Sequence, residues 1–322
     1  MKTLKKALVL ALALTMLVTV AFSATACGEK KSYTIGISQL VTHDALDAAT
    51  EGFKQAVKDE LGEENVTFLY QNAAGDTAVC TTIANDFVSK NVDLIMANAT
   101  AALQAAAAST TTIPILGTSI TEYGVALNIE NFTGTVGGNI SGTSDLAPLS
   151  EQAQMMIDLF PNAKTVGMLY CSAEPNSAYQ VKVVREYLEG KGLTVNDYAF
   201  ADSNDIATIV EKAANDCDLI YIPTDNTAAS CTETINNICL PKKVPVFAGE
   251  EGICKGCGTF TLSISYYEIG YKTGKMAADI LKNGADISTM AIEYDPNPVK
   301  KYNKSICEAL GVTVPEGYTA IE

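Results

Sequence analysis

Apolar runs typical of β-strands alternate with helix-like stretches along most of this chain, and the alternation occurs twice. The first strand-like runs cover residues 33–40, 66–71, 92–100 and 113–119, with helical patterns at 45–61, 77–90 and 101–109. The second runs cover 165–171, 193–200, 217–226 and 244–252, with helical patterns at 177–190, 205–214 and 229–238. Such alternation is the signature of parallel βαβ units. We therefore predict an α/β protein with two lobes, each built on a parallel sheet.

The two halves also match each other in detail. VDLIMANATAALQAAA and CDLIYIPTDNTAASCTE share an aspartate, an apolar strand, a polar tip and a helix of small residues. Linking segments are expected at 134–148, 261–267 and 294–302, and a helix at 267–282 would return to the first lobe. We predict an N-terminal lobe from 33–143 plus 266–293 and a C-terminal lobe from 144–265 plus 294–322. A cleft would lie between the lobes.

The N-terminus reads as an export signal. Three lysines precede an apolar stretch at 7–22 that is short for a spanning helix, and Ala24-Thr25-Ala26 leads into Cys27. This resembles a bacterial lipoprotein box, which implies a signal peptide at 1–26, lipidation of Cys27 and a tether at 27–32. Ordinary cleavage with a bystander cysteine is the alternative. The anchored protein would lie on the outer face of the cytoplasmic membrane or in the periplasm.

Charge and motifs exclude several classes of function. The net charge of −15 includes three lysines and no acids within 1–26, so the mature chain carries −15 − 3 = −18. Such a surface repels nucleic acid. The glycine-rich GTVGGNISG at 134–142 has the wrong spacing for a dinucleotide fingerprint, and the sequence contains no phosphate-binding G-x-x-x-x-G-K-[ST] motif. His43 is the only histidine, which excludes a zinc site built on several histidines. We expect neither a cofactor nor a metal.

Eight cysteines remain besides Cys27, an even number that permits disulfides without showing them. Cys171 and Cys217 lie in apolar strand-like runs, where a free buried thiol is the simpler interpretation. Cys254 and Cys257 form a single C-x-x-C, for which a local disulfide or two free thiols is favoured over a redox centre.

The polar tips of the predicted strands provide the candidate site, because ligands of parallel sheets bind beyond the carboxyl ends of the strands. Asn176 and Ser177 begin a helix, as Thr100 does in the first lobe, so each could cap its helix or direct N–H groups at an anion. Asp225 and Glu250 follow neighbouring strands. Asp225 could cap a helix, and the two acids could be the partners of a ligand ammonium or a catalytic pair, although no nucleophile with its own base is evident.

These tips carry a family resemblance. The segments QLVTHDALDAATEGFKQAV, FLYQNAAGD, ATAALQAAA, PNAKTVGMLYCSAEPNSAYQVK, DLIYIPTDNTAAS and PVFAGEEG resemble, in this order, substrate-binding lipoproteins of ABC transporters of the tryptophan- and aromatic-amino-acid-binding type. The resemblance implies a type I periplasmic-binding fold, in which two Rossmann-like lobes joined by three crossovers close on a ligand. It implies the ligand-binding residues Gln39, His43, Gln71, Thr100, Asn176, Ser177, Asp225, Asn226, Glu250 and Tyr266.

The resemblance also implies which part of the ligand some of these residues contact. Asn176, Ser177 and Thr100 would face a ligand carboxylate, and Asp225 with Glu250 its ammonium. The expected protein is a monomer and not an enzyme, which delivers an aromatic amino acid to ABC permease subunits. An exported two-lobed enzyme using Asp225 and Glu250, or a ligand-sensing lipoprotein, is the alternative.

Overall fold

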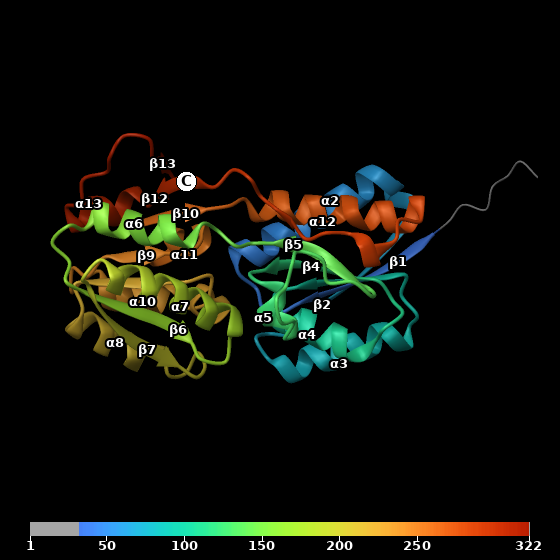
Figure 1. Ribbon diagram of the computed structural model, residues 1–322, viewed down its shortest axis with the longest axis horizontal. Helices are drawn as coiled ribbons and strands as arrows, with labels where there is room; N and C mark the ends of the chain where they lie inside the picture. Colours follow the sequence, from blue (N-terminus) through green and yellow to red (C-terminus); the bar gives the residue numbers. More distant parts are fainter. Residues whose placement is uncertain (1–31, 322) are drawn as a thin grey trace, which may run out of the picture.

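The computed structural model describes residues 32–321 and consists of two α/β lobes side by side (Figure 1). The predicted α/β architecture with parallel sheets is confirmed. The predicted signal peptide and the lipidation of Cys27 lie outside the described residues. Within 32–321, no helix combines the length and hydropathy needed to cross a membrane.

The first lobe is built on a six-stranded sheet with the order β11-β5-β4-β3-β1-β2. Its strands are parallel because each returns through a helix, as the sequence pattern predicted. Its elements are β1 (Tyr33–Gln39), α2 (Asp44–Leu61), η1 (Glu63–Asn65), β2 (Val66–Asn72), α3 (Thr77–Ser89), β3 (Leu94–Asn98), α4 (Thr100–Ser109), β4 (Ile115–Ile120), α5 (Tyr123–Leu127), β5 (Ile140–Ser144), α12 (Tyr266–Asn283), η2 (Ile287–Thr289) and β11 (Glu293–Tyr294).

The second lobe contains a seven-stranded sheet with the order β13-β12-β10-β9-β8-β6-β7. Strand β12 runs antiparallel to β10, because the chain enters this sheet at the hinge and runs away from it. The elements are α6 (Leu149–Leu159), β6 (Thr165–Cys171), α7 (Pro175–Gly190), β7 (Thr194–Phe200), α8 (Ile206–Asp216), β8 (Leu219–Ile222), α9 (Asn226–Ala229), α10 (Thr232–Cys239), β9 (Val246–Ala248), α11 (Glu251–Cys257), β10 (Phe260–Ser263), β12 (Val299–Tyr302), α13 (Lys304–Leu310) and β13 (Thr319–Ala320). The helix predicted at 229–238 is two helices, since α9 already begins after Asp225.

Helices cover both faces of the first sheet (Figure 1). One face packs against α3 and α4 through residues such as Phe87 and Leu103, and the other packs against α2 and α12 through Phe53 and Met276. Helices α2 and α12 approach closely because glycines lie at their contact. A Cβ on Gly270 would lie 2.0 Å from the carbonyl oxygen of Ala49. A helix that follows the second lobe in sequence thus completes the core of the first.

The chain passes between the two sheets three times, through residues 145–148, 264–265 and 295–298. Ser144 and Tyr294, which the sequence analysis places in the C-terminal lobe, pair with each other at the edge of the first sheet. Hydrogen bonds tie the crossovers together: Tyr266 Oη donates to Asp145 Oδ2 at 2.8 Å, and the Ser265 amide donates to Asp295 Oδ2 at 3.1 Å. The three crossovers therefore form one connected hinge.

Candidate functional site

Two cavities lie in the cleft between the lobes, where the carboxyl ends of the parallel strands meet. The outer cavity, of about 210 Å³, is lined from both lobes, with Leu40, Val41 and Ala101 on one side and Pro175 and Asn176 on the other. The inner cavity, of about 10 Å³, lies at the hinge. It is lined by His43, Leu46, Ser119, Asp145, Asn176, Thr224, Asp225, Asn226, Ala229, Glu250 and Tyr266. Asn176 and Asn226 line both cavities, so the two are adjoining compartments of one cleft.

The hinge supplies two polar groups of the inner cavity. Asp145 follows β5 on the first crossover and is only 5% exposed. Its Oδ2 accepts from Tyr266, whereas Oδ1 has no hydrogen-bond partner among residues 32–321. Burial raises the pKa of Asp145, and the hydroxyls of Tyr266 and Thr121 offset part of that shift. Buried acceptors are nearly always hydrogen-bonded, so Asp145 Oδ1 is available to a donor from outside the described residues.

Ser119 reaches the same cavity through an irregularity of β4. The pairing of β4 with β5 shifts register between Gly117 and Ile120, and Ser119 takes a φ of 56°, a left-handed value that is uncommon outside glycine. The Ser119 side chain is 7% exposed, and its Oγ has no hydrogen-bond partner in the described part of the chain. Backbone strain of this kind tends to occur at functional sites, where it orients a side chain.

His43 and Asn226 connect the lobes across the cleft. His43, the N-cap residue of α2, places Nε2 at 3.2 Å from Asn226 Oδ1. The Asn226 amide is oriented by Glu174, whose Oε2 accepts from Asn226 Nδ2 at 2.7 Å. A second contact joins the lobes where the hydroxyls of Thr121 and Thr224 lie 3.3 Å apart. The lobes are therefore in direct contact in this structure.

Asp225 and Glu250 both line the inner cavity and both cap short helices. Asp225 Oδ1 accepts from the Ala228 amide at 2.8 Å and Oδ2 from the Cys171 amide at 2.7 Å. Glu250 Oε2 accepts from the Gly252 amide at 2.6 Å, and Oε1 from the Ile253 amide. The helix-cap interpretation of Asp225 is thus confirmed, and Glu250 caps α11 in the same way. Both roles coexist with a position at the cavity wall.

Burial of these two acids perturbs their ionisation. Burial raises the pKa of Glu250 to about 7, and the amides of Gly252 and Ile253 offset part of the shift. Burial and then the nearby Glu174 carboxylate raise the pKa of Asp225, with the Ala228 and Cys171 amides acting in the opposite direction. Both shifts arise because charged carboxylates are poorly solvated there. A positive charge in the cavity would lower both pKa values.

The described residues that line the two cavities include no positively charged side chain. Neither cavity has a lysine or arginine among its lining residues within 32–321. In the same range, Asp145, Glu174, Asp225 and Glu250 form no ion pair. Nor do three His, Cys, Asp or Glu side chains group closely enough there to hold a metal ion. The inner cavity is therefore acidic without a counterion of its own.

The other predicted site residues have partners within their own lobes. Gln39 Oε1 accepts from Thr50 at 2.7 Å, and Gln71 Nε2 donates to Asp86 at 2.7 Å, so neither side chain lines the inner or the outer cavity. Thr100 begins α4 and lines neither cavity, although the next residue, Ala101, lines the outer one.

Asn176 and Ser177 are not caps, as Glu174 occupies the N-cap position of α7. Asn176 Nδ2 donates to the Thr224 carbonyl oxygen at 3.0 Å, and Ser177 is fully buried. Asn176 still lines both cavities, whereas Ser177 lines neither. Of the ten residues proposed from the sequence, His43, Asn176, Asp225, Asn226, Glu250 and Tyr266 line the inner cavity.

Three residues that the sequence analysis did not select complete the site: Ser119, Asp145 and Glu174. Ser119 lies at a predicted strand tip, so its position gave a signal. Asp145 lies in a segment interpreted only as a linker, and nothing in its local pattern marks it. Glu174 Oε1 accepts from the Thr227 amide at 2.9 Å and its Oε2 from the Asn226 amide at 3.0 Å, contacts that depend on the packing of two loops.

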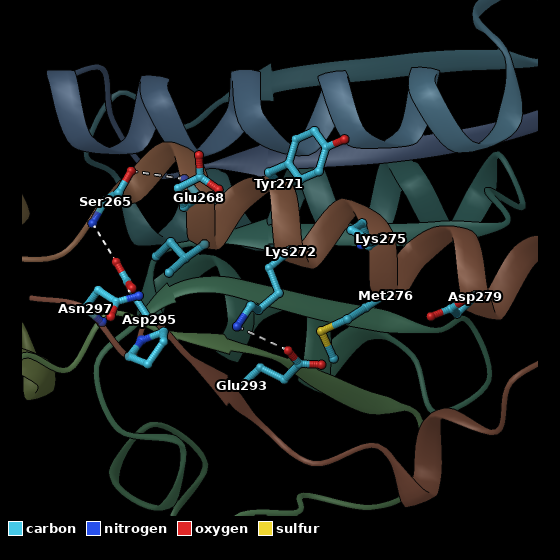
Figure 2. Close-up of a pocket in the computed structure, with 12 residues that line it drawn as sticks. Ser265, Glu268, Tyr271, Lys272, Lys275, Met276, Asp279, Glu293, Asp295 and Asn297 are labelled. Carbon is cyan, nitrogen blue, oxygen red and sulfur yellow. Dashed lines mark hydrogen bonds and ion pairs between the residues drawn. The ribbon is translucent and has the colours of Figure 1, made fainter.

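A larger hollow, of about 720 Å³, lies outside the cleft along α12 and the third crossover (Figure 2). Several of its polar groups have partners close by. Lys272 Nζ lies 3.4 Å from Glu293 Oε2 and donates to the Tyr294 carbonyl oxygen, and Asp295 accepts from the Ser265 and Asn297 amides. Because these groups are already satisfied, we place the candidate site in the cleft and not here.

All eight cysteines within the described residues are free thiols. Cys254 and Cys257 are buried, and burial raises the pKa of each thiol well above its ordinary value. Neither the disulfide nor the redox interpretation of this C-x-x-C is supported, because a buried, protonated thiol is inert.

The chain belongs to the family described as ABC transporter substrate binding protein, whose profile it matches over residues 34–320. Substrate-binding proteins of ABC importers are extracytoplasmic solute-binding proteins and not enzymes. A tyrosine-binding protein from Clostridioides difficile is 33% identical over 271 residues, covering 82% of this chain and 77% of the relative.

Two solved structures resemble this one over 90% of the chain. One, from Streptococcus pneumonia in complex with L-Trp, has a TM-score of 0.86 at 31% identity and is covered completely. The other is a ligand-free, open structure of a substrate-binding protein with adhesive properties from Clostridium difficile, with a TM-score of 0.68 at 34% identity and 99% coverage. At similar identity the lobes here thus match the L-Trp complex better than the open structure.

Proposed function

We propose that this chain is the receptor of an ABC importer for an aromatic α-amino acid, on which its two lobes close. The observation that carries the proposal is the inner cavity. Buried acceptors without partners in the described chain, Asp145 Oδ1 and Ser119 Oγ, lie there beside the carboxyl groups of Asp225 and Glu250. Such a set suits an ammonium group, which donates three hydrogen bonds and carries the missing charge.

The outer cavity suits the rest of the ligand. Its wall combines apolar side chains such as Leu40, Val41 and Pro175 with polar ones, and its volume of about 210 Å³ gives room for a ring. Helix α4 begins beside it without a side-chain cap, so its free N–H groups can receive a carboxylate. The binding of tyrosine and of L-Trp by the two relatives named above supports an aromatic side chain.

Micromolar affinity is within reach of these contacts. A hydrogen bond to a charged group contributes roughly 1.5 to 3 kcal/mol. Two or three such bonds and the burial of one ring reach about −8 kcal/mol, which corresponds to a micromolar dissociation constant.

The proposal includes membrane tethering through a lipid on Cys27 and delivery of the ligand to ABC permease subunits by a monomeric receptor. The two lobes would move as units about the three crossovers. Enzymatic use of Asp225 and Glu250 gains no support, since the family to which the chain belongs consists of solute-binding proteins.

The test begins with what the protein carries. The chain is purified without refolding, the bound molecule is released and identified by mass spectrometry, and calorimetry then measures L-tryptophan, L-tyrosine and L-phenylalanine. Recovery of an intact aromatic amino acid, with micromolar or tighter rebinding, is the expected result. Failure of all three to bind would refute the aromatic assignment, and chemical change of the bound molecule during incubation would favour an enzyme.

A further inference from the structure

We infer that the site selects its ligands chiefly by a positively charged amine, so that an aromatic amine binds even without a carboxylate. This inference rests on the proposed function and concerns the same cleft. It predicts that removing the amino group of the ligand costs more affinity than removing its carboxylate.

The first step concerns Asp145 and Ser119, which line the inner cavity from the first lobe and the hinge. Both side chains are more than nine-tenths buried, and among residues 32–321 neither Asp145 Oδ1 nor Ser119 Oγ has a hydrogen-bond partner. Buried polar atoms are nearly always paired in folded proteins. A carboxylate oxygen can only accept, so the missing partner of Asp145 is a donor.

His43 adds a third acceptor at this cavity. Glu174 Oε2 accepts from Asn226 Nδ2, which turns Asn226 Oδ1 toward His43 Nε2. The neutral imidazole must therefore carry its proton on Nε2, and Nδ1 is left with a lone pair. His43 Nδ1 is buried and has no hydrogen-bond partner in the described part of the chain. Burial also lowers the pKa of His43, which keeps the ring neutral.

The second step concerns the places where a ligand carboxylate could bind. The N-terminus of α9 already holds the carboxyl groups of Asp225 and Glu174, and the N-terminus of α11 holds that of Glu250. Neither cavity has a lysine or an arginine among its described lining residues. Helices α2, α4 and α7 begin beside the cavities without a side-chain cap, so uncharged backbone N–H groups are what a carboxylate would find. The described lining thus offers several carboxyl groups to a cation and no charged group to an anion.

The third step compares the cost of losing each end of the ligand. Without its ammonium, the ligand leaves Asp145, Asp225 and Glu250 buried with no cation among the described residues. A buried charge without a partner is strongly unfavourable, so these groups would have to take up protons instead. Without its carboxylate, the ligand leaves only uncharged N–H groups at these helix starts, and an unpaired N–H group costs less than an unpaired buried charge.

The experiment uses the purified full-length chain, freed of bound ligand, and matched probes. Calorimetry measures L-tyrosine, tyramine and 3-(4-hydroxyphenyl)propionate, and likewise L-tryptophan, tryptamine and indole-3-propionate. Tyramine or tryptamine should bind within about tenfold of its parent amino acid, whereas the propionate should lose about 100-fold or more, as expected for two charged hydrogen bonds.

The outcomes separate the inference from the proposed function. A propionate that binds as well as its amino acid, or better than the amine, overturns the inference and leaves the receptor function standing. Binding of the amines without the amino acids supports the inference and refutes amino-acid transport. Failure of every probe refutes both.

Two variants test the assigned groups. Asp145→Asn should reduce the preference for the amino acid over its propionate by about tenfold or more. Asp158→Asn makes the same change on the exposed surface of α6, away from both cavities, and should leave that preference unchanged. If Asp145→Asn does not fold, Ser119→Ala serves instead, because Ser119 Oγ has no partner to lose in the described chain. An unchanged preference in the folded variant would remove that residue from the amine site.

Discussion

The empty protein should become more stable as the pH falls from about 8 to about 5, with Glu250 as a principal cause. Burial raises the pKa of Glu250 to about 7 in the folded state, against an ordinary value of 4.5. Between these two values the folded protein holds a proton that the unfolded chain has lost, so the free energy of unfolding rises as the pH falls. The full effect of this pKa difference is about 3 kcal/mol, absent above the folded pKa and complete below the unfolded one.

Other buried groups act in the same window, so a matched variant is needed. Burial raises the pKa of Asp145 and Asp225, which gives their contributions the same sign. Burial lowers the pKa of His43 from its ordinary 6.5, so acidification destabilises the fold through this residue. Glu250→Gln removes one titration and leaves the others. It also changes the cap of α11, which shifts the stability by an amount that does not depend on pH.

The assay is urea unfolding of ligand-free protein at several pH values across this window, for the natural chain and for Glu250→Gln. The difference in unfolding free energy between the two proteins should grow by about 3 kcal/mol in favour of the natural chain from high to low pH. Two parallel curves would show that Glu250 ionises normally and would refute the account of a cavity without a counterion.

Three further outcomes are expected. Gly270→Val should destabilise the protein by about 3 kcal/mol in urea unfolding, because a Cβ there would lie 2.0 Å from the carbonyl oxygen of Ala49. The control Gly190→Ala, whose Cβ would have no neighbour within 4 Å, should change the stability by less than about 1 kcal/mol. Gly252→Val should weaken ligand binding by about tenfold and enlarge the radius of gyration of the ligand-saturated protein in X-ray scattering. A Cβ there would lie 3.2 Å from both carboxyl oxygens of Glu250, which affects binding directly, and 3.3 Å from Asp44 Cβ in the other lobe, which opposes closure. Unchanged scattering would contradict the contact between the lobes. A thiol titration of the denatured, unreduced protein should find all eight described cysteines reactive, and fewer would reveal a disulfide.

Much of the fold could be predicted because it depends on local patterns. The strand at 165–171 is predicted with the bounds that the structure gives to β6, and the helix predicted at 267–282 lies within α12. Apolar periodicity and helix signals are properties of neighbouring residues, and they are strong in βαβ units. The interrupted helix after Asp225 was missed, because its cap depends on the Cys171 and Ala228 amides together.

The site was less predictable because its residues meet only in three dimensions. Asp225 and Glu250 could be selected as acids that follow apolar strands. Asp145 could not, since its significance comes from burial at the hinge and from an oxygen without a partner in the described residues. Gln39 is the opposite case: it lies at a strand tip, yet its Oε1 accepts from Thr50 within its own lobe.

The position of α12 has a consequence for the order in which the molecule assembles. Five strands of the second sheet come from one continuous stretch, 165–263, whereas one face of the first sheet is covered by α2 and by α12, and α12 is synthesised only after that stretch. The first lobe therefore keeps part of an apolar surface uncovered until α12 has been synthesised. A holding chaperone acting during export would find its binding surface on that uncovered face.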